Sequence, residues 1–112
     1  MEIKILGTEY KILYANEQED ERLKQCDGYC DFTTKNIVCM DKKEQDIMEV
    51  GDLNVIKKKI LRHEIIHAFM YESGLWENSF SVQNWSTNEE MTDWFAMQSP
   101  KIFKVYKKLN IL

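Results

Sequence analysis

One long segment, residues 53–75, constrains the fold of this chain more than any other. Its sequence, LNVIKKKILRHEIIHAFMYESGL, is typical of a helix, and Asp52 or Asn54 can cap its start. At its end, Gly74 followed by Leu75 fits a left-handed stop. Apolar residues occupy the second half nearly all round, a pattern that is typical of a buried helix. We therefore expect this helix to run through the core.

The same helix carries both histidines of the chain, His63 and His67, with Glu64 directly after the first. Side chains four residues apart project from one helical face, so both imidazoles can reach one tetrahedral Zn²⁺ at about 2.0–2.1 Å. Glu64 is rotated from His63 by about 100°. It is poorly placed as a further ligand, but it can take a proton from zinc-bound water. The alternative is a metal-free core that contains HExxH by chance.

A catalytic zinc needs a third protein ligand and one open position. No histidine remains, and the acidic candidates in the next predicted helix are Glu89, Glu90 and Asp93. If Thr87 caps that helix, Glu90 completes a capping box and Glu89 is free to turn inward. If Ser86 is the cap, Glu89 takes the capping role instead. Asp93 can orient a zinc-bound histidine through a hydrogen bond. Alternatively, all three acids are solvated charges favoured by the helix dipole.

The rest of the chain predicts a small sheet and two further helices. The expected elements are a hairpin over 2–14, strands over 29–32 and 36–40, and helices over 86–99 and 99–110. Pro100 fits the first turn of the last helix, and residues 15–25 form a loop or a short exposed helix. Together these elements predict an α+β fold. A three- or four-stranded, mostly antiparallel sheet packs on the HExxH helix, and residues 37–40 form an edge to which an extended peptide can add.

With 112 residues, the chain fits one domain, residues 1–112. Its formal net charge is −4, and it contains neither a long apolar run nor a signal-peptide pattern. We therefore expect a cytoplasmic monomer that binds neither nucleic acid nor membranes. A second metal site at Cys26, Cys30 and Cys39 lacks a fourth ligand and CxxC spacing. The odd number of cysteines favours reduced, structural thiols.

At this point the sequence resembles a known family of enzymes. HEIIH is followed, 22 positions after its second histidine, by Glu89-x-x-x-Asp93, which resembles the HExxH plus ExxxD pattern of gluzincin metallopeptidases. HEIIHA with EEMTDWFA also resembles the small ImmA/IrrE-like zinc peptidases of phages and mobile elements, whose second helix often reads E-x-x-A-[DN]-x-F-A. Phe95 and Ala96 match that pattern as well, whereas Thr92 stands where Ala is usual. The resemblance covers roughly residues 55–100.

The resemblance implies a zincin-like fold and one Zn²⁺ bound by His63, His67 and Glu89, with Glu64 as general base. It also implies a peptide or protein substrate, and a repressor-like regulator is one candidate because ImmA/IrrE-like proteins can act on repressors. Two departures matter. Ile66 replaces the Gly of HExGH, and no third histidine is present to stabilise an oxyanion.

Tyr29 and Tyr71 are candidates for the missing oxyanion-stabilising group. The expected function is therefore that of a zinc-dependent peptidase in which water, activated by the metal, hydrolyses a peptide bond. The alternative is a catalytically silent, zinc-stabilised interaction module that acts on a regulator. Glu64 favours the enzyme, because a purely structural zinc site needs no base.

Overall fold

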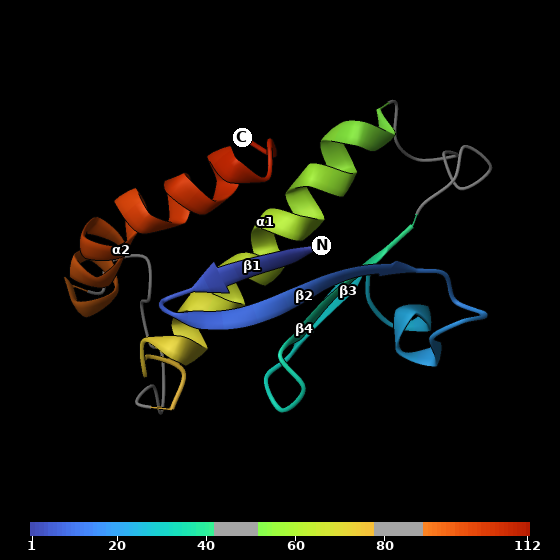
Figure 1. The fold of residues 1–112 in the computed structure, drawn as a ribbon, viewed down its shortest axis with the longest axis horizontal. Helices are drawn as coiled ribbons and strands as arrows, with labels where there is room; N and C mark the ends of the chain where they lie inside the picture. The colour runs from blue at the N-terminus through green and yellow to red at the C-terminus, as the bar shows by residue number, and fades with distance from the viewer. Residues whose placement is uncertain (42–51, 78–88) are drawn as a thin grey trace.

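The computed structural model describes residues 1–41, 52–77 and 89–112. Within the last range, five side chains lie outside the description: those of Glu89, Glu90, Thr92, Asp93 and Ala96. The described residues form an α+β fold, in which two long helices pack on a four-stranded sheet (Figure 1). The predicted α+β class is therefore confirmed.

The sheet begins with the predicted hairpin of β1 (Glu2–Ile5) and β2 (Thr8–Ala15), which pair antiparallel. Leu6 and Gly7 make the turn with φ values of 50° and 88°. This left-handed backbone is costly for most residues and cheap for glycine. In both strands the inward residues are buried and apolar, as the short alternation of the sequence predicts.

A second antiparallel pair, β3 (Gly28–Asp31) and β4 (Asn36–Met40), also lies where the sequence predicts it. Between β2 and β3, the chain forms a single short 3₁₀ helix, η1 (Glu21–Lys24), capped by Asp20. β4 pairs with β2 in parallel, so the strand order is β1-β2-β4-β3 and the sheet is mixed. The expectation of a mostly antiparallel sheet holds for two of the three strand pairings.

The strand order corrects one prediction about the sheet edge. Residues 37–40 belong to β4, which has a hydrogen-bonded neighbour on each side, so they cannot accept an added strand. Among the described strands, the two at the edges of the sheet are β1 and β3. Local sequence carries the alternation of a strand but no signal for its neighbours, because the parallel β2–β4 pairing depends on how distant segments dock.

Helix α1 (Leu53–Glu72) has the predicted ends. The Asp52 side chain accepts hydrogen bonds from the backbone amides of Asn54 and Val55, and Gly74 follows the helix with φ 83°. The face toward the sheet is buried and includes Leu61, Ile65, Ala68 and Phe69. The expectation that α1 runs through the core is wrong, however, because the side chain of His63 is 65% exposed. The helix lies on the sheet, so its opposite side stays accessible.

The two helices predicted over 86–99 and 99–110 are a single helix, α2 (Glu89–Lys108), with Pro100 inside it. An internal proline costs about 3 kcal/mol. Ile102, Val105 and Tyr106 are buried after it, and each such side chain contributes about 1.5–3 kcal/mol. Their burial therefore outweighs the proline. Among the described residues, no helix has the length and apolar character to cross a membrane.

The end of α1 is tied to the sheet through the carboxylate of Glu72. It accepts hydrogen bonds from Thr8 Oγ1 at 3.0 Å, Tyr10 OH at 2.6 Å and Lys35 Nζ at 2.7 Å. Burial alone would raise the pKa of Glu72, but these hydrogen bonds and the lysine charge outweigh it. The net result is a pKa below the ordinary 4.5. The ionised form therefore stabilises the fold.

We expect Glu72→Gln to lower the free energy of unfolding at pH 7 by about 1–3 kcal/mol, the cost of weakening charge-assisted hydrogen bonds. Because the pKa is lowered on folding, this stabilisation is complete above pH 4.5 and is lost as the pH falls through the folded-state value. Urea unfolding of both proteins at pH 7 and pH 3 measures the difference. A destabilisation of equal size at both pH values would contradict the assignment.

Candidate metal centre

The two histidines of α1 point at one another. Their Nε2 atoms lie 3.0 Å apart, and the rings are inclined by 79°. Two nitrogens that bind one tetrahedral Zn²⁺ at 2.0–2.1 Å lie about 3.3 Å apart, so the pair is close to the spacing that the ion needs. An N–H···N hydrogen bond between neutral rings fits the same distance. The pair can therefore share either a proton or a metal ion.

The remaining nitrogen of His67 is a second feature that fits a metal ligand. Nδ1 is buried, and no described acceptor reaches it. A metal-bound histidine normally donates its other N–H to a carboxylate or carbonyl. Burial, followed by the neighbouring His63, lowers the pKa of His67. This keeps the ring in the neutral form that binds metal.

Glu64 lies beside the pair, on the buried side of the helix. Its side chain is 6% exposed, and Oε1 is 4.0 Å from His63 Nε2. Burial raises the pKa of Glu64 to about 7. The carboxyl group borders a pocket of about 300 Å³, whose wall also includes His63, Cys26, Asp27 and Gly28. Glu64 can therefore exchange a proton near neutral pH with a molecule in this pocket.

Gly28 lets the sheet approach Glu64. A Cβ atom at this position would lie 2.9 Å from the Val38 carbonyl oxygen, 3.0 Å from Ile60 Cγ2 and 3.4 Å from Glu64 Cγ. Only glycine allows β3 and α1 to come this close. In the sequence, Asp27-Gly28 indicates only a turn and gives no sign of this role. A tight contact between distant segments leaves no local pattern.

The free edge of β3 runs beside the two histidines. Gly28, at its start, is next to Glu64, and Phe32, just after its end, stacks on Tyr71 with ring centroids 4.3 Å apart. The Asp27 carbonyl accepts a hydrogen bond from the Met40 amide at 2.8 Å. Antiparallel pairs alternate, so the backbone groups of Gly28 and Cys30 point away from β4. An extended chain can pair with them.

Aromatic rings extend from His67 towards the end of β3. Trp76 meets His67 edge to face at 5.5 Å and Phe32 at 5.2 Å between centroids. Trp76 is 48% exposed, so this aromatic cluster of Phe32, Tyr71 and Trp76 reaches the surface. Nothing in the sequence marks Phe32 or Trp76 as part of a site. Single aromatic residues in turns are too common to mark a site.

The two predicted oxyanion candidates differ in their surroundings. The hydroxyl of Tyr29 donates a hydrogen bond to Asp20, and burial together with that bond raises the pKa of Tyr29 to about 12. Its proton is therefore already engaged. Tyr71 belongs to the aromatic cluster, and the Lys35 ammonium lies 4.6 Å from its ring centroid. Of the two, Tyr71 lies on α1 itself, four residues after His67 and so on the same face of the helix.

The three cysteines are free, as the sequence predicts. Burial is the main cause that raises the pKa of Cys30 and of Cys39 to about 12, which disfavours the thiolate that binds metal. Cys26 is exposed, and its thiol donates to the Arg22 carbonyl at 3.3 Å. Within the described side chains, no three His, Cys, Asp or Glu residues come close enough to hold a metal ion.

The predicted third ligand, Glu89, and the predicted positioning residue, Asp93, belong to the start of α2, and their side chains lie outside the described residues. The two candidate caps, Ser86 and Thr87, lie outside as well. The next residue, Trp94, donates from Nε1 to Ser73 Oγ at 2.8 Å. This hydrogen bond places the start of α2 at the end of α1 that carries His67.

Comparison with known proteins provides no independent assignment. No protein-family model, curated protein or solved structure matches the chain. The similarity to gluzincins therefore rests on the two motifs, and the candidate site rests on its own geometry.

Proposed function

We propose that the protein is a zinc-dependent peptidase, with one Zn²⁺ held by His63, His67 and Glu89. The observation that supports this proposal most strongly is the facing Nε2 pair with a buried carboxyl group beside it. A purely structural zinc site has no need for an ionisable group at that position. Asp93 is the proposed partner of the unpaired Nδ1 of His67.

Zn²⁺ bound there would acidify water and polarise the scissile carbonyl. Glu64 takes a proton from the attacking water and delivers it to the leaving amine. A pKa of about 7 in the metal-free site suits both roles, and a nearby cation favours the carboxylate needed for the first. Burial excludes bulk water from one side of Glu64, so the proton stays with the reacting groups.

The substrate in this proposal is an extended peptide that pairs with the free edge of β3. The outward backbone groups of Gly28 and Cys30 would hold its main chain, and the aromatic cluster would receive one of its side chains. This moves the proposed docking strand from residues 37–40 to β3. A peptide paired with β3 would run alongside the histidine pair, because both ends of β3 lie beside α1. Its scissile bond would therefore lie near the two histidines.

A library of peptides of diverse sequence tests the proposed activity. The zinc-loaded protein is incubated with the library, and new amino termini are identified by mass spectrometry. We expect cleavage at a restricted set of sequences, loss of cleavage with a zinc chelator, and recovery when zinc is returned. Cleavage that persists in chelator would point to another enzyme. No zinc-dependent cleavage at all would favour the interaction module.

A further inference from the structure

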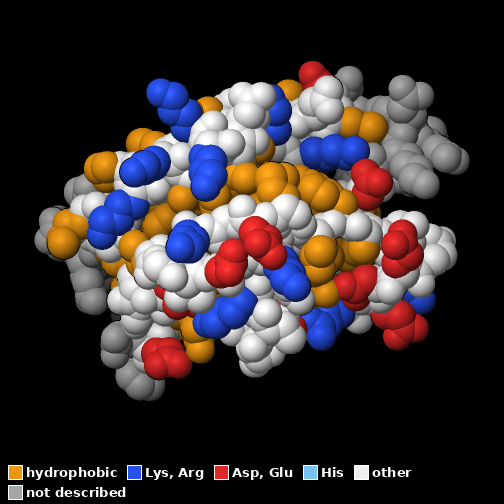
Figure 2. Space-filling view, in the orientation of Figure 1, with side chains coloured by type: hydrophobic (Ala, Val, Ile, Leu, Met, Phe, Trp, Pro, Cys, Tyr) orange, Lys and Arg blue, Asp and Glu red, His pale blue; other side chains and the backbone are white. Residues whose placement is uncertain are grey.

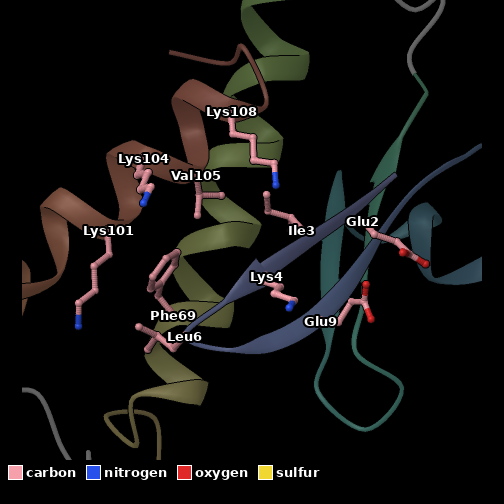
Figure 3. A pocket seen from close by; sticks show the side chains of 10 residues that line it. All are labelled: Glu2, Ile3, Lys4, Leu6, Glu9, Phe69, Lys101, Lys104, Val105 and Lys108. Carbon is pink, nitrogen blue, oxygen red and sulfur yellow. The ribbon is translucent and has the colours of Figure 1, made fainter.

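A second hollow lies on the other side of α1. It is a groove of about 680 Å³ between β1 and α2. Apolar side chains of Ile3, Leu6, Phe69 and Val105 contribute to its lining, as Figure 3 shows. In Figure 2 an apolar band crosses the middle of this face, with lysine and arginine side chains gathered on its α2 side. Phe69 follows His67 by two residues, or about 200° around the helix, so the groove is separate from the metal centre.

The rim of the groove carries more positive than negative charge, because its four lysines outnumber its two glutamates, Glu2 and Glu9. Lys101, Lys104 and Lys108 line it from one face of α2, and Lys4 lines it from β1 (Figure 3). Among the described residues, none of these four lysines forms an ion pair. Like charges three or four residues apart on a helix repel one another. A rim of this kind in a chain of net charge −4 is suited to an anionic partner.

The groove also contains an unpaired sheet edge. Met1 and Ile12 exchange backbone hydrogen bonds, with Ile12 N to Met1 O at 2.7 Å and Met1 N to Ile12 O at 3.4 Å. Because hydrogen-bonded pairs alternate in an antiparallel ladder, the backbone groups of Glu2 and Lys4 point away from β2. No other described strand pairs with β1 on that side. These groups are available to an added strand.

We propose that this groove binds an acidic, extended segment of a partner protein, which adds to β1 as a fifth strand of the sheet. Every second side chain of such a segment would face the apolar lining, so these residues would be aliphatic. The intervening acidic residues would lie on the same face of the sheet as Lys4, and the long, flexible lysines of α2 would reach them around the outer edge of the added strand. A nucleic acid would use the lysines, but it would leave the apolar lining and the backbone edge without partners.

Fluorescence anisotropy with a labelled decapeptide of alternating Val and Glu tests the proposal. We expect saturable binding that weakens with added salt, and none by the peptide of alternating Val and Lys. Lys101→Glu combined with Lys104→Glu raises the dissociation constant at least tenfold. Lys107→Glu, on the same helix but outside the groove, changes it less than twofold. No binding of the acidic peptide, an equal effect of Lys107→Glu, or tighter binding of a ten-nucleotide thymidine strand would overturn the proposal.

A pair of substitutions at one position tests strand addition apart from charge. Lys4→Ala and Lys4→Pro remove the same ammonium group, but only the proline removes the outward N–H. We expect Lys4→Pro to bind the acidic peptide at least fivefold more weakly than Lys4→Ala, with thermal unfolding used to confirm that both are folded. If Lys4→Pro is unfolded, the same comparison is made with a peptide whose alternate amides are methylated. Equal affinity in these comparisons would reject the added strand.

Discussion

Glu64→Gln is expected to abolish peptide cleavage, by about a thousandfold or more, without removing zinc. The amide has the shape of the carboxyl group but cannot accept the proton of the attacking water. Burial already favours the neutral carboxyl in the metal-free site, so a neutral amide is well tolerated there. Single-turnover assays on a peptide from the library, together with zinc analysis of the same sample, measure both effects.

Glu72→Gln is the matched control, because it makes the same exchange two turns further along α1. It should retain cleavage at neutral pH, at a temperature at which it remains folded. Cleavage by Glu64→Gln at the wild-type rate would remove Glu64 as the base. If a regulatory effect on a partner survives Glu64→Gln while no cleavage is ever seen, the zinc-stabilised interaction module becomes the better account.

If zinc binds at the proposed site, it stabilises the fold, and His63→Ala is expected to remove that stabilisation. At a zinc concentration about a thousand times its dissociation constant, a single site contributes about 4 kcal/mol. For a domain of this size, that raises the Tm by about 10–20 °C. His63 is more exposed than His67, so its replacement should hardly change the Tm of the metal-free protein. Calorimetry with and without zinc separates these two quantities.

Lys58→Ala is the control for His63→Ala, since it removes another exposed side chain of α1. It should keep the full zinc-dependent rise in Tm. A rise of equal size in His63→Ala would place the zinc elsewhere, while a large fall in the Tm of metal-free His63→Ala would make the histidine a structural residue.

The elements that the sequence predicts correctly are those whose signals are local. Asp52 and Gly74 bracket α1 because capping and left-handed stops depend on neighbouring residues. The β1–β2 hairpin follows from alternation around Gly7. Pro100 misleads because its helix-breaking signal is also local, whereas the burial of Ile102 and Tyr106 that overrides it depends on the fold.

The residues of the candidate site also fall into two groups, those with a local sequence signal and those without one. The central pair, His63 and His67, could be found from spacing alone, because four residues make one turn of a helix. Gly28 and Trp76 could not, since each acts through a contact with a distant segment. The edge strand was misplaced for the same reason. The order of β3 and β4 in the sheet is set by long-range pairing, which leaves no trace in the alternation of either strand.

Zinc content tests the central claim most directly. Wild type, Glu89→Ala and Glu90→Ala are purified without a histidine tag, and zinc per chain is determined by elemental mass spectrometry. The account predicts about one zinc per chain in wild type and in Glu90→Ala, with clear loss in Glu89→Ala. Equal zinc in all three would reject Glu89 as the third ligand. No zinc in wild type, even after zinc is added back, would make His63 and His67 a metal-free pair and contradict the proposed peptidase.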